Sequence, residues 1–466
     1  METALSVQSG RWVLAAITVL VGAAAAALLA AGLPLHGLVL GAAVLFPYLL
    51  YLAFTRPLAF PFGLYVLLVP IDNILSFGSF GTITKLLGIV SGAFLLLWIV
   101  RRGVHTAPLK AQLLPLVLLI LWMFVSVYWA LDQRVAVGII PTYAGLMLLF
   151  VALTFTPLSA RDFQAILVCV IVGGIGAAAY GANVFFHHPN QEQLDTGRLI
   201  IEVGNSSIDP NHFANSLLFP AAALGIWALR TARAYAKVAG LAGSGLMLAA
   251  IMYSGSREAL AAFAAIVVYY FLRTRYRVQV ALAALAAFAA AVSTQTTMWT
   301  RFSTVFLTGG SGRTSIWAVA IEAAKHRLLQ GYGIGNFEQA YDLYYLAVPQ
   351  AYPYGWSSPA HNIIFHYVVE IGLVGMLLIL WFYGSFFFSL RSVKRGSPLY
   401  DYRVMLEASL IAIAIVAFNI DLFTYKYAWL VFSAAALLCN AAAYQQQREE
   451  ILAQSSDMMA ERPLRA

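Results

Sequence analysis

Residues 111–130 read Ala-Gln-Leu-Leu-Pro-Leu-Val-Leu-Leu-Ile-Leu-Trp-Met-Phe-Val-Ser-Val-Tyr-Trp-Ala, and no charged side chain occurs among them. A helix of about 20 apolar residues is long enough to cross the ~30 Å hydrocarbon layer of a bilayer. This stretch therefore indicates a transmembrane helix.

Apolar stretches of the same kind recur along the whole chain. Of its 466 residues, 61% are hydrophobic and 10% are charged, whereas soluble domains carry about 25% charged residues. The sequence predicts an all-α polytopic membrane protein with about 12–14 transmembrane helices. We expect one transmembrane domain over residues 1–444, followed by a polar cytoplasmic tail over 445–466. The expected spans are 12–32, 37–54, 58–77, 83–100, 111–130, 135–155, 162–182, 212–229, 236–254, 257–272, 278–293, 362–390, 404–422 and 426–444.

Basic residues show a pattern that predicts the orientation. They recur in every second loop, for example at Arg101 and Arg102, between Arg273 and Arg277, and between Arg391 and Arg403. Cytoplasmic loops carry an excess of lysine and arginine, so both termini are expected in the cytoplasm. The same rule accounts for the formal net charge of +8 without a nucleic-acid partner.

Two long connections, about 183–211 and 293–361, are expected on the outer face. Long loops in compact domains are often functional. In the second loop, Thr314 to Leu329 predicts a short amphipathic helix on that face, and Gly331, Gly333 and Gly335 are expected to end it.

Basic residues on the outer side oppose the charge bias and are candidates for function. Arg257 follows Ser256 where two spans meet, and Arg313 follows a glycine-rich turn at a helix start, where anions are favoured. The arginine fork matches phosphate geometry. Interfacial snorkelling, ion pairing and lipid headgroup contact remain alternatives. The full set is Lys85, Arg134, Arg198, Arg257, Arg301, Arg313, Lys325, Arg327 and Lys426.

Polar residues also stand where the long loops return to the membrane. His361 could take a proton from a hydroxyl, with Asn362 beside it to position a polar partner, or it could cap the following span. Asp209 and Asn211 could cap a helix whose first turn contains Pro210, or Asn211 could line a polar cavity.

Metal and cofactor signals are weak. The adjacent His187 and His188 have no spaced partner, and the two cysteines, Cys169 and Cys439, lie inside apolar runs. No Walker or dinucleotide glycine motif occurs. We expect no metal and no cofactor.

Several of these residues occur together in an order that resembles the O-antigen ligase and O-antigen polymerase superfamily, which includes exopolysaccharide polymerases. The similarity covers about 209–375, with a compatible number of helices around it. The matching residues are Asp209-Pro-Asn211, Ser256-Arg257, Gly312-Arg313 with Trp317, Gly331-Tyr-Gly-Ile-Gly-Asn-Phe337, His361-Asn362 and Glu370-Ile-Gly372.

The resemblance implies a reaction and a location. Such enzymes of the bacterial inner membrane move a glycan from undecaprenyl diphosphate to a sugar hydroxyl on the periplasmic side, without metal or nucleotide. The acceptor is lipid A–core for ligases and another lipid-linked glycan for polymerases. By position, Arg257 and Arg313 match the residues thought to bind the diphosphate, and His361 matches the proposed base. Arg198, Asn211, Asn362 and Arg301 are expected substrate ligands.

Other functions remain open at this stage. The His361-Asn362 match favours a ligase slightly over a polymerase, and protein O-oligosaccharyl transfer is a related possibility. A flippase or transporter of lipid-linked glycans would need charged residues inside many spans, and the expected spans are nearly uncharged except at their ends. A purely structural membrane scaffold does not explain the uneven outer charge.

Overall fold

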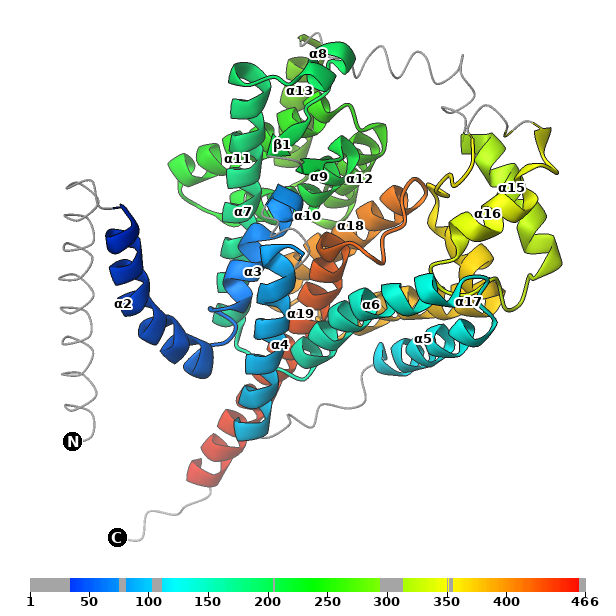
Figure 1. The fold of residues 1–466 in the computed structure, drawn as a ribbon. Coiled ribbons are helices and arrows are strands. Elements are labelled where there is room, and N and C mark those ends of the chain that lie inside the picture. The colour runs from blue at the N-terminus through cyan, green and yellow to red at the C-terminus, as the bar shows by residue number, and fades with distance from the viewer. Residues whose placement is uncertain are drawn as a thin grey trace, which may run out of the picture.

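A computed structural model describes residues 34–74, 81–102, 111–203, 206–293, 313–349, 351 and 355–460 (Figure 1). The expected span 12–32 and the candidate ligand Arg301 lie outside these residues.

Nearly all described residues belong to helices. The α-helices are α2 Pro34–Thr55, α3 Phe62–Leu68, α4 Ile83–Arg102, α5 Leu113–Ser126, α6 Gln133–Thr154, α7 Ala160–His187, α8 Gln191–Thr196, α9 Pro210–Ser216, α10 Leu218–Arg230, α11 Ala234–Ser254, α12 Arg257–Arg273, α13 Arg277–Ser293, α15 Arg313–His326, α16 Phe337–Tyr345, α17 Ile363–Leu390, α18 Tyr400–Ala417 and α19 Lys426–Ala460.

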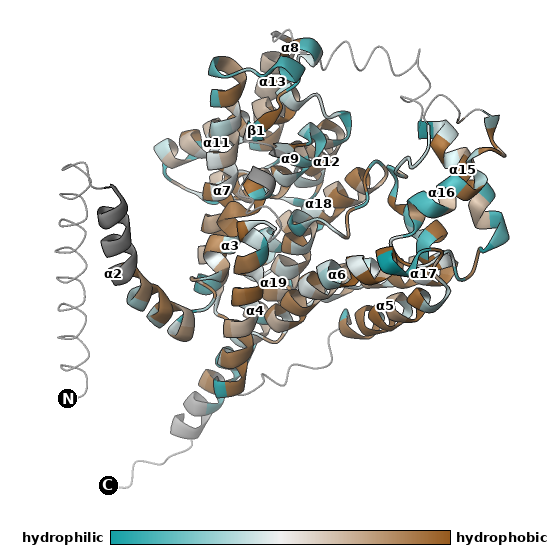
Figure 2. Cartoon of the chain, viewed as in Figure 1, coloured by the Kyte–Doolittle hydropathy of each residue, from teal (hydrophilic) through white to brown (hydrophobic). Residues whose placement is uncertain are grey.

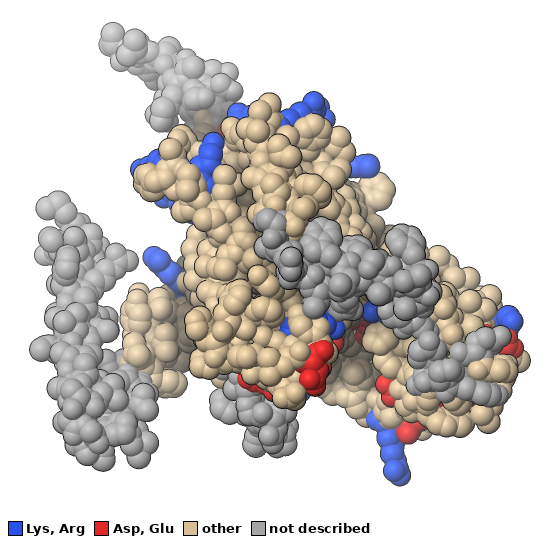
Figure 3. All heavy atoms as spheres, turned by 90° about the horizontal axis from the view of Figure 1, so that it is seen from above, with Lys and Arg blue, Asp and Glu red and all other residues tan. Residues whose placement is uncertain are grey.

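Many of these helices are apolar along most of their length (Figure 2). Seven helical segments in the described part of the chain are long and apolar enough to cross a membrane: Ile83–Arg101, Gln133–Thr154, Ala160–His187, Pro210–Arg230, Ala234–Ser254, Ile363–Leu390 and Lys426–Leu452. Four apolar segments are shorter: Leu45–Thr55, Phe62–Asp72, Leu113–Trp129 and Arg277–Val292. The prediction of an all-α polytopic membrane protein is confirmed. Seen from above, most of the visible surface is uncharged (Figure 3).

Polar side chains at the span ends fix where several helices begin. Asp132 caps α6 by accepting from the backbone N–H groups of Arg134 and Val135, at 2.8 and 3.3 Å. Ser159 and Asp162 form a reciprocal capping box at the start of α7. These contacts satisfy N–H groups that a helix leaves unpaired at its first turn.

Aromatic side chains hold α17 against α6 and α19. The rings of Phe386 and Phe432 stack with centroids 5.0 Å apart, and Phe150 of α6 meets Phe382 edge-on at 5.6 Å. All four side chains are buried. Aromatic pairs of this geometry are worth about 0.5–1.5 kcal/mol beyond their buried area. They fix α17, whose cap Asn362 directly follows His361.

A break in α17 interlocks with the glycine-rich segment 331–337. At Gly372 the backbone has φ 72° and ψ −178°, a conformation essentially restricted to glycine. The N–H groups of Tyr332 and Gly333 donate to the carbonyls of Val369 and Glu370, at 2.8 and 2.7 Å. A Cβ atom on Gly372 would lie 2.1 Å from the Leu329 carbonyl oxygen. The glycines therefore permit two backbones to touch.

The two long loops contain more structure than the sequence predicts. The helix expected over 314–329 exists as α15, which ends before Gly331 as expected. Gly331, Gly333 and Gly335 all have positive φ. Helix α16 and a two-stranded antiparallel sheet, β1 Ile201–Val203 and β2 Ser206–Ile208, were not predicted. Helices α15 and α16 pack on each other through a small apolar core, and their outer surface carries both polar and apolar residues (Figure 2).

Candidate functional site

A cavity of about 280 Å³ lies where the two long loops return to the helices. Its walls come from the start of α9, the start of α15, the segment that enters α17, and the connection between α18 and α19. The residues around it are Asp209, Asn211, His212, Arg313, Pro359, Ala360, His361, His366, Asn419, Ile420, Asp421 and Tyr425. Helices α15 and α17 both begin at this cavity. The N-terminus of a helix stabilises a negative charge placed near it.

Arg313 is the first residue of α15 and faces the cavity. Its guanidinium donates to the Oδ1 atom of Asn419, which fixes the side chain. Burial lowers the pKa of Arg313 below its ordinary value, and the Glu258 carboxylate opposes that shift. An arginine remains charged under these conditions. Arg313 therefore presents a positioned, partly desolvated cation.

Arg198 lies near the corner between α11 and α12, where α12 begins with Arg257. Arg198 donates from Nε to the Ser254 carbonyl at 2.8 Å and from Nη2 to Asn211 Oδ1 at 2.9 Å. Arg257 is the first residue of α12, directly after the capping residue Ser256. Burial lowers the pKa of Arg198, and the positive charge of Arg257 lowers it further.

The same Arg257 charge also lowers the pKa of Arg313. The positive charge of Arg257 thus repels both Arg198 and Arg313. Asp209 and Glu258 act on both Arg198 and Arg313 in the opposite direction. Repelling cations that are held in place favour the binding of an anion between them.

His361 belongs to the segment that precedes α17. It has a positive φ of 47° and lines the cavity. Burial lowers the pKa of His361 below its ordinary value of 6.5, and the nearby Arg313 charge lowers it further. A neutral imidazole at neutral pH can accept a proton.

Asn362, and not His361, caps α17. Its Oδ1 atom accepts from the N–H groups of Ile364 and Phe365, at 2.9 and 3.2 Å, and its Nδ2 atom donates to the Phe418 carbonyl at 3.0 Å. The side chain is buried. Its amide thereby fixes the backbone that carries His361, and substrate binding by Asn362 stays a prediction.

Asp209 caps α9, as the sequence predicts. Its Oδ1 atom accepts from the backbone N–H groups of Asn211 and His212, at 2.7 and 3.2 Å, and Pro210 occupies the first turn. Because Asp209 is the capping residue, the Asn211 side chain does not cap α9. It lines the cavity and accepts from Arg198.

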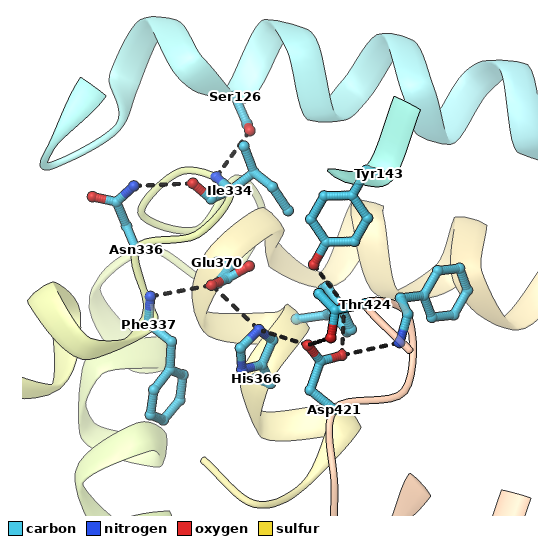
Figure 4. Close-up of polar contacts among 11 residues, drawn as sticks. Ser126, Tyr143, Ile334, Asn336, Phe337, His366, Glu370, Asp421 and Thr424 are labelled. Carbon is cyan, nitrogen blue, oxygen red and sulfur yellow. Dashed lines mark hydrogen bonds and ion pairs between the residues drawn. The ribbon is translucent and has the colours of Figure 1, made fainter. Parts of the chain in front are cut away.

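Sequence reasoning missed a buried acidic pair around His366. Its Nε2 atom lies 3.3 Å from Glu370 Oε1 and 3.7 Å from Asp421 Oδ2 (Figure 4). Asp421 also accepts from the Tyr367 hydroxyl at 2.6 Å. His366 and Asp421 both line the cavity. A lone carboxylate near an apolar run marks a functional candidate and was the available signal for Asp421.

Glu370 connects this group to the glycine-rich segment. Its Oε1 atom accepts from the Phe337 N–H at 3.3 Å, and the ring of Phe337 stacks on His366 with centroids 5.5 Å apart. The next residue back, Asn336, accepts from the Asp132 N–H at 2.6 Å and so ties the segment to the residue that caps α6. Its Nδ2 atom donates to the Ile334 carbonyl at 3.0 Å (Figure 4). The glycine-rich segment thus holds the wall of the cavity and does not form part of it.

The structure brings together most of the residues that the sequence selected. Arg313, His361 and Asn211 line one cavity. Arg198 donates to Asn211, and the charge of Arg257 acts on Arg313. Among the described residues no group of histidine, cysteine, aspartate and glutamate has the arrangement of a metal site.

The fold and this cavity define a class of protein: a multi-pass helical membrane protein with a cationic, partly enclosed site between its long loops. Residues 242–380 match the O-antigen ligase family model, and this part of the chain belongs to that family. The matched segment runs from α11 into α17 and contains Arg257, Arg313 and His361. No curated protein matches the chain. The family implies glycosyl transfer of the ligase or polymerase type and lipid-linked glycan substrates.

Proposed function

We propose that the protein transfers a glycan from undecaprenyl diphosphate to a sugar hydroxyl on the periplasmic side of the bacterial inner membrane. We favour a ligase with lipid A–core as acceptor, which acts without metal and inverts the anomeric centre. The observation that carries the proposal is that Arg313 and His361 line one cavity, with Arg257 acting on Arg313.

The donor supplies its own leaving group. During transfer the bond between the sugar C1 and the diphosphate oxygen breaks, and negative charge grows on the diphosphate. Arg257 and Arg313 would stabilise this charge, and Arg198 would support them. Fixed donors in a partly dry site need no reorganisation during the reaction, so they stabilise the transition state more than the ground state.

His361 would take the proton of the acceptor hydroxyl as its oxygen bonds to C1. The pKa of His361 lies below its ordinary value, so the ring is neutral and able to accept that proton at neutral pH. The acceptor would attack from the side opposite the diphosphate, which inverts C1. Holding both substrates in one cavity replaces an encounter in solution with an oriented reaction.

The acceptor that receives the glycan distinguishes a ligase from a polymerase. Purified protein in lipid would be given an undecaprenyl-diphosphate oligosaccharide together with lipid A–core. We expect the glycan on lipid A–core. A ladder of repeats on undecaprenyl diphosphate would instead assign polymerase activity, with the same residues in the same roles.

A flippase of lipid-linked glycans is the alternative from another class. In sealed vesicles, movement of the donor between leaflets with no new glycosidic bond would favour it and would refute glycosyl transfer. A variant His361→Ala serves as the control, because loss of the base should abolish transfer but should not affect movement of the lipid.

A further inference from the structure

A tryptophan is exposed on the segment that leads into the cavity. Trp356 lies five residues before His361 and is 56% exposed. The other exposed tryptophans in the described part of the chain, Trp227 and Trp381, belong to apolar spans, where lipid can cover them. Trp356 instead lies in residues 355–362, which form no regular element. A tryptophan presented in this way is a candidate contact for a ligand.

The ring of Trp356 is held in place from two sides. Its centroid lies 4.6 Å from that of Tyr345, a buried residue of α16, and the two rings are tilted by 52°. The next residue, Ser357, donates from its backbone N–H and its Oγ atom to the two carboxylate oxygens of Asp342, at 2.6 and 2.9 Å. The indole is thus fixed against α16 while more than half of it stays exposed. We call Tyr345 and Trp356 the aromatic platform.

Backbone strain marks the same segment. Ser357 has a φ of 54° and His361 a φ of 47°, and they are the two non-glycine residues with positive φ in the described ranges. Such conformations cost free energy and collect at active sites and ligand clamps. The indole N–H of Trp317 donates to the Ala360 carbonyl at 3.0 Å, which fixes the end of the segment at the cavity. The platform and the proposed base therefore stand at the two ends of one fixed segment.

The chemistry of the platform fits a sugar ring. A sugar presents faces of C–H groups that stack on aromatic rings, and hydroxyls that donate to carboxylates. A carboxylate offers about four acceptor positions, and Ser357 uses two of those on Asp342. The negative charge of Asp342 would repel the phosphate of a lipid headgroup or of the donor. These properties favour an uncharged sugar ring over an anionic lipid.

We propose that the aromatic platform binds a sugar ring of the acceptor glycan. This inference rests on the proposed function, in which His361 takes the proton of the acceptor hydroxyl. Five residues of chain span at most about 18 Å, so the platform lies within reach of the same oligosaccharide whose end sugar reacts at His361. Binding a sugar there would hold that end sugar in position for the reaction.

Acceptor length provides the kinetic test. Transfer by the full-length protein in lipid would be measured with the core oligosaccharide and with the end sugar of that core alone. We expect Trp356→Ala to raise KM for the oligosaccharide about tenfold and to leave kcat and the KM for the donor unchanged, because the contact aids binding only. The KM for the single sugar should not change, because it does not reach both sites. Trp356→Phe keeps a ring and should recover most of the loss.

Trp381→Ala is the matched control, because Trp381 is 48% exposed but lies in a span. Its KM for the oligosaccharide should equal that of the unaltered protein. An unchanged KM in Trp356→Ala, or an equal rise in Trp381→Ala, would overturn the proposal. So would a lower kcat of Trp356→Ala with both acceptors at unchanged KM, because that result would mean that Trp356 only supports the position of His361. Failure of the unaltered protein to transfer to any acceptor would instead refute the proposed function.

Binding can also be measured without turnover. Core oligosaccharide freed from its lipid would be added to the full-length protein in nanodiscs without donor, and saturation-transfer NMR would record which sugar protons contact the protein. We expect transfer to ring C–H protons of a sugar behind the end sugar, lost in Trp356→Ala and kept in His361→Ala and Trp381→Ala. The same signals in Trp356→Ala as in the unaltered protein would contradict the proposal and would leave Trp356 as a contact to the bilayer.

Discussion

The Nε2 atom of His366 lies 3.3 Å from the Oε1 atom of Glu370, one turn further along α17. A second carboxylate, that of Asp421, lies 3.7 Å from the same nitrogen. One imidazole thus stands between two acidic groups in the wall of the cavity. This arrangement joins α17 to the connection between α18 and α19 and to the glycine-rich segment that carries Phe337.

Removing the imidazole should destabilise the protein. In His366→Phe the ring contact with Phe337 is kept, but Glu370 and Asp421 lose the group between them. Breaking a buried charged pair costs about 3–5 kcal/mol. We expect a clearly lower unfolding temperature in detergent, measured by intrinsic fluorescence.

His326→Phe is a close control for that measurement. His326 also pairs with a glutamate four residues away, Glu322, at 3.6 Å, and stacks on Tyr344, but its side chain is 54% exposed. Exposed pairs contribute little. An equal loss of stability in the two variants would show that the buried group around His366 has no special role.

The break in α17 gives a second prediction. Gly372→Ala would place a Cβ atom 2.1 Å from the Leu329 carbonyl oxygen at a φ of 72°. A residue forced into such a conformation costs about 1–3 kcal/mol, and the clash adds to this cost. We expect a lower unfolding temperature together with reduced transfer, because α17 and its cap Asn362 position the adjacent His361.

Gly384→Ala, in the same helix, provides the comparison. A Cβ atom there meets nothing within 4 Å. Alanine also has the higher helix propensity. The variant should be as stable as the unaltered protein, and a loss matching that of Gly372→Ala would mean that the helix break is not what makes Gly372 necessary.

Arg313 should be needed for transfer and not for folding. Loss of one fixed donor to a developing negative charge costs about 10²–10³ in kcat. Arg313→Ala should show a loss of this order with normal membrane insertion. Arg313→Lys should recover part of it, because lysine keeps the charge but not the planar fork. Arg391→Ala, at the exposed far end of α17, should retain full activity. Full activity in Arg313→Ala would exclude a role in binding the diphosphate.

The pH dependence of kcat/KM should follow the protonation state of His361. Its pKa lies below 6.5 because of burial and the Arg313 charge, so the neutral base forms as pH rises through that lower value. We expect kcat/KM to increase with pH, with a midpoint below 6.5, and to be level near neutrality. In Arg313→Gln the residual activity should titrate at a higher pH, because one positive neighbour is gone. A midpoint above 6.5 in the unaltered protein would exclude His361 as the base.

The membrane helices could be predicted from sequence because hydropathy is a local property. The expected spans from 37–54 to 426–444 each overlap described helices, and seven helical segments are long and apolar enough to cross a membrane. Asp209 also caps α9 as expected. The group around His366 could not be predicted. Asp421 lies far from His366 in sequence, and its distance from that side chain depends on how α18 and α19 pack on α17. The interlock between Gly333 and Glu370 is equally a product of long-range packing.

Donor turnover by the purified protein tests the central claim most directly. Undecaprenyl-diphosphate oligosaccharide and a lipid A–core acceptor would be combined without nucleotide, and the glycosylated acceptor and free undecaprenyl diphosphate would both be quantified. The account predicts equal amounts of the two products from the unaltered protein and neither product from His361→Ala or Arg313→Ala. Absence of both products from a correctly inserted, unaltered protein, or equal turnover by His361→Ala, would contradict it.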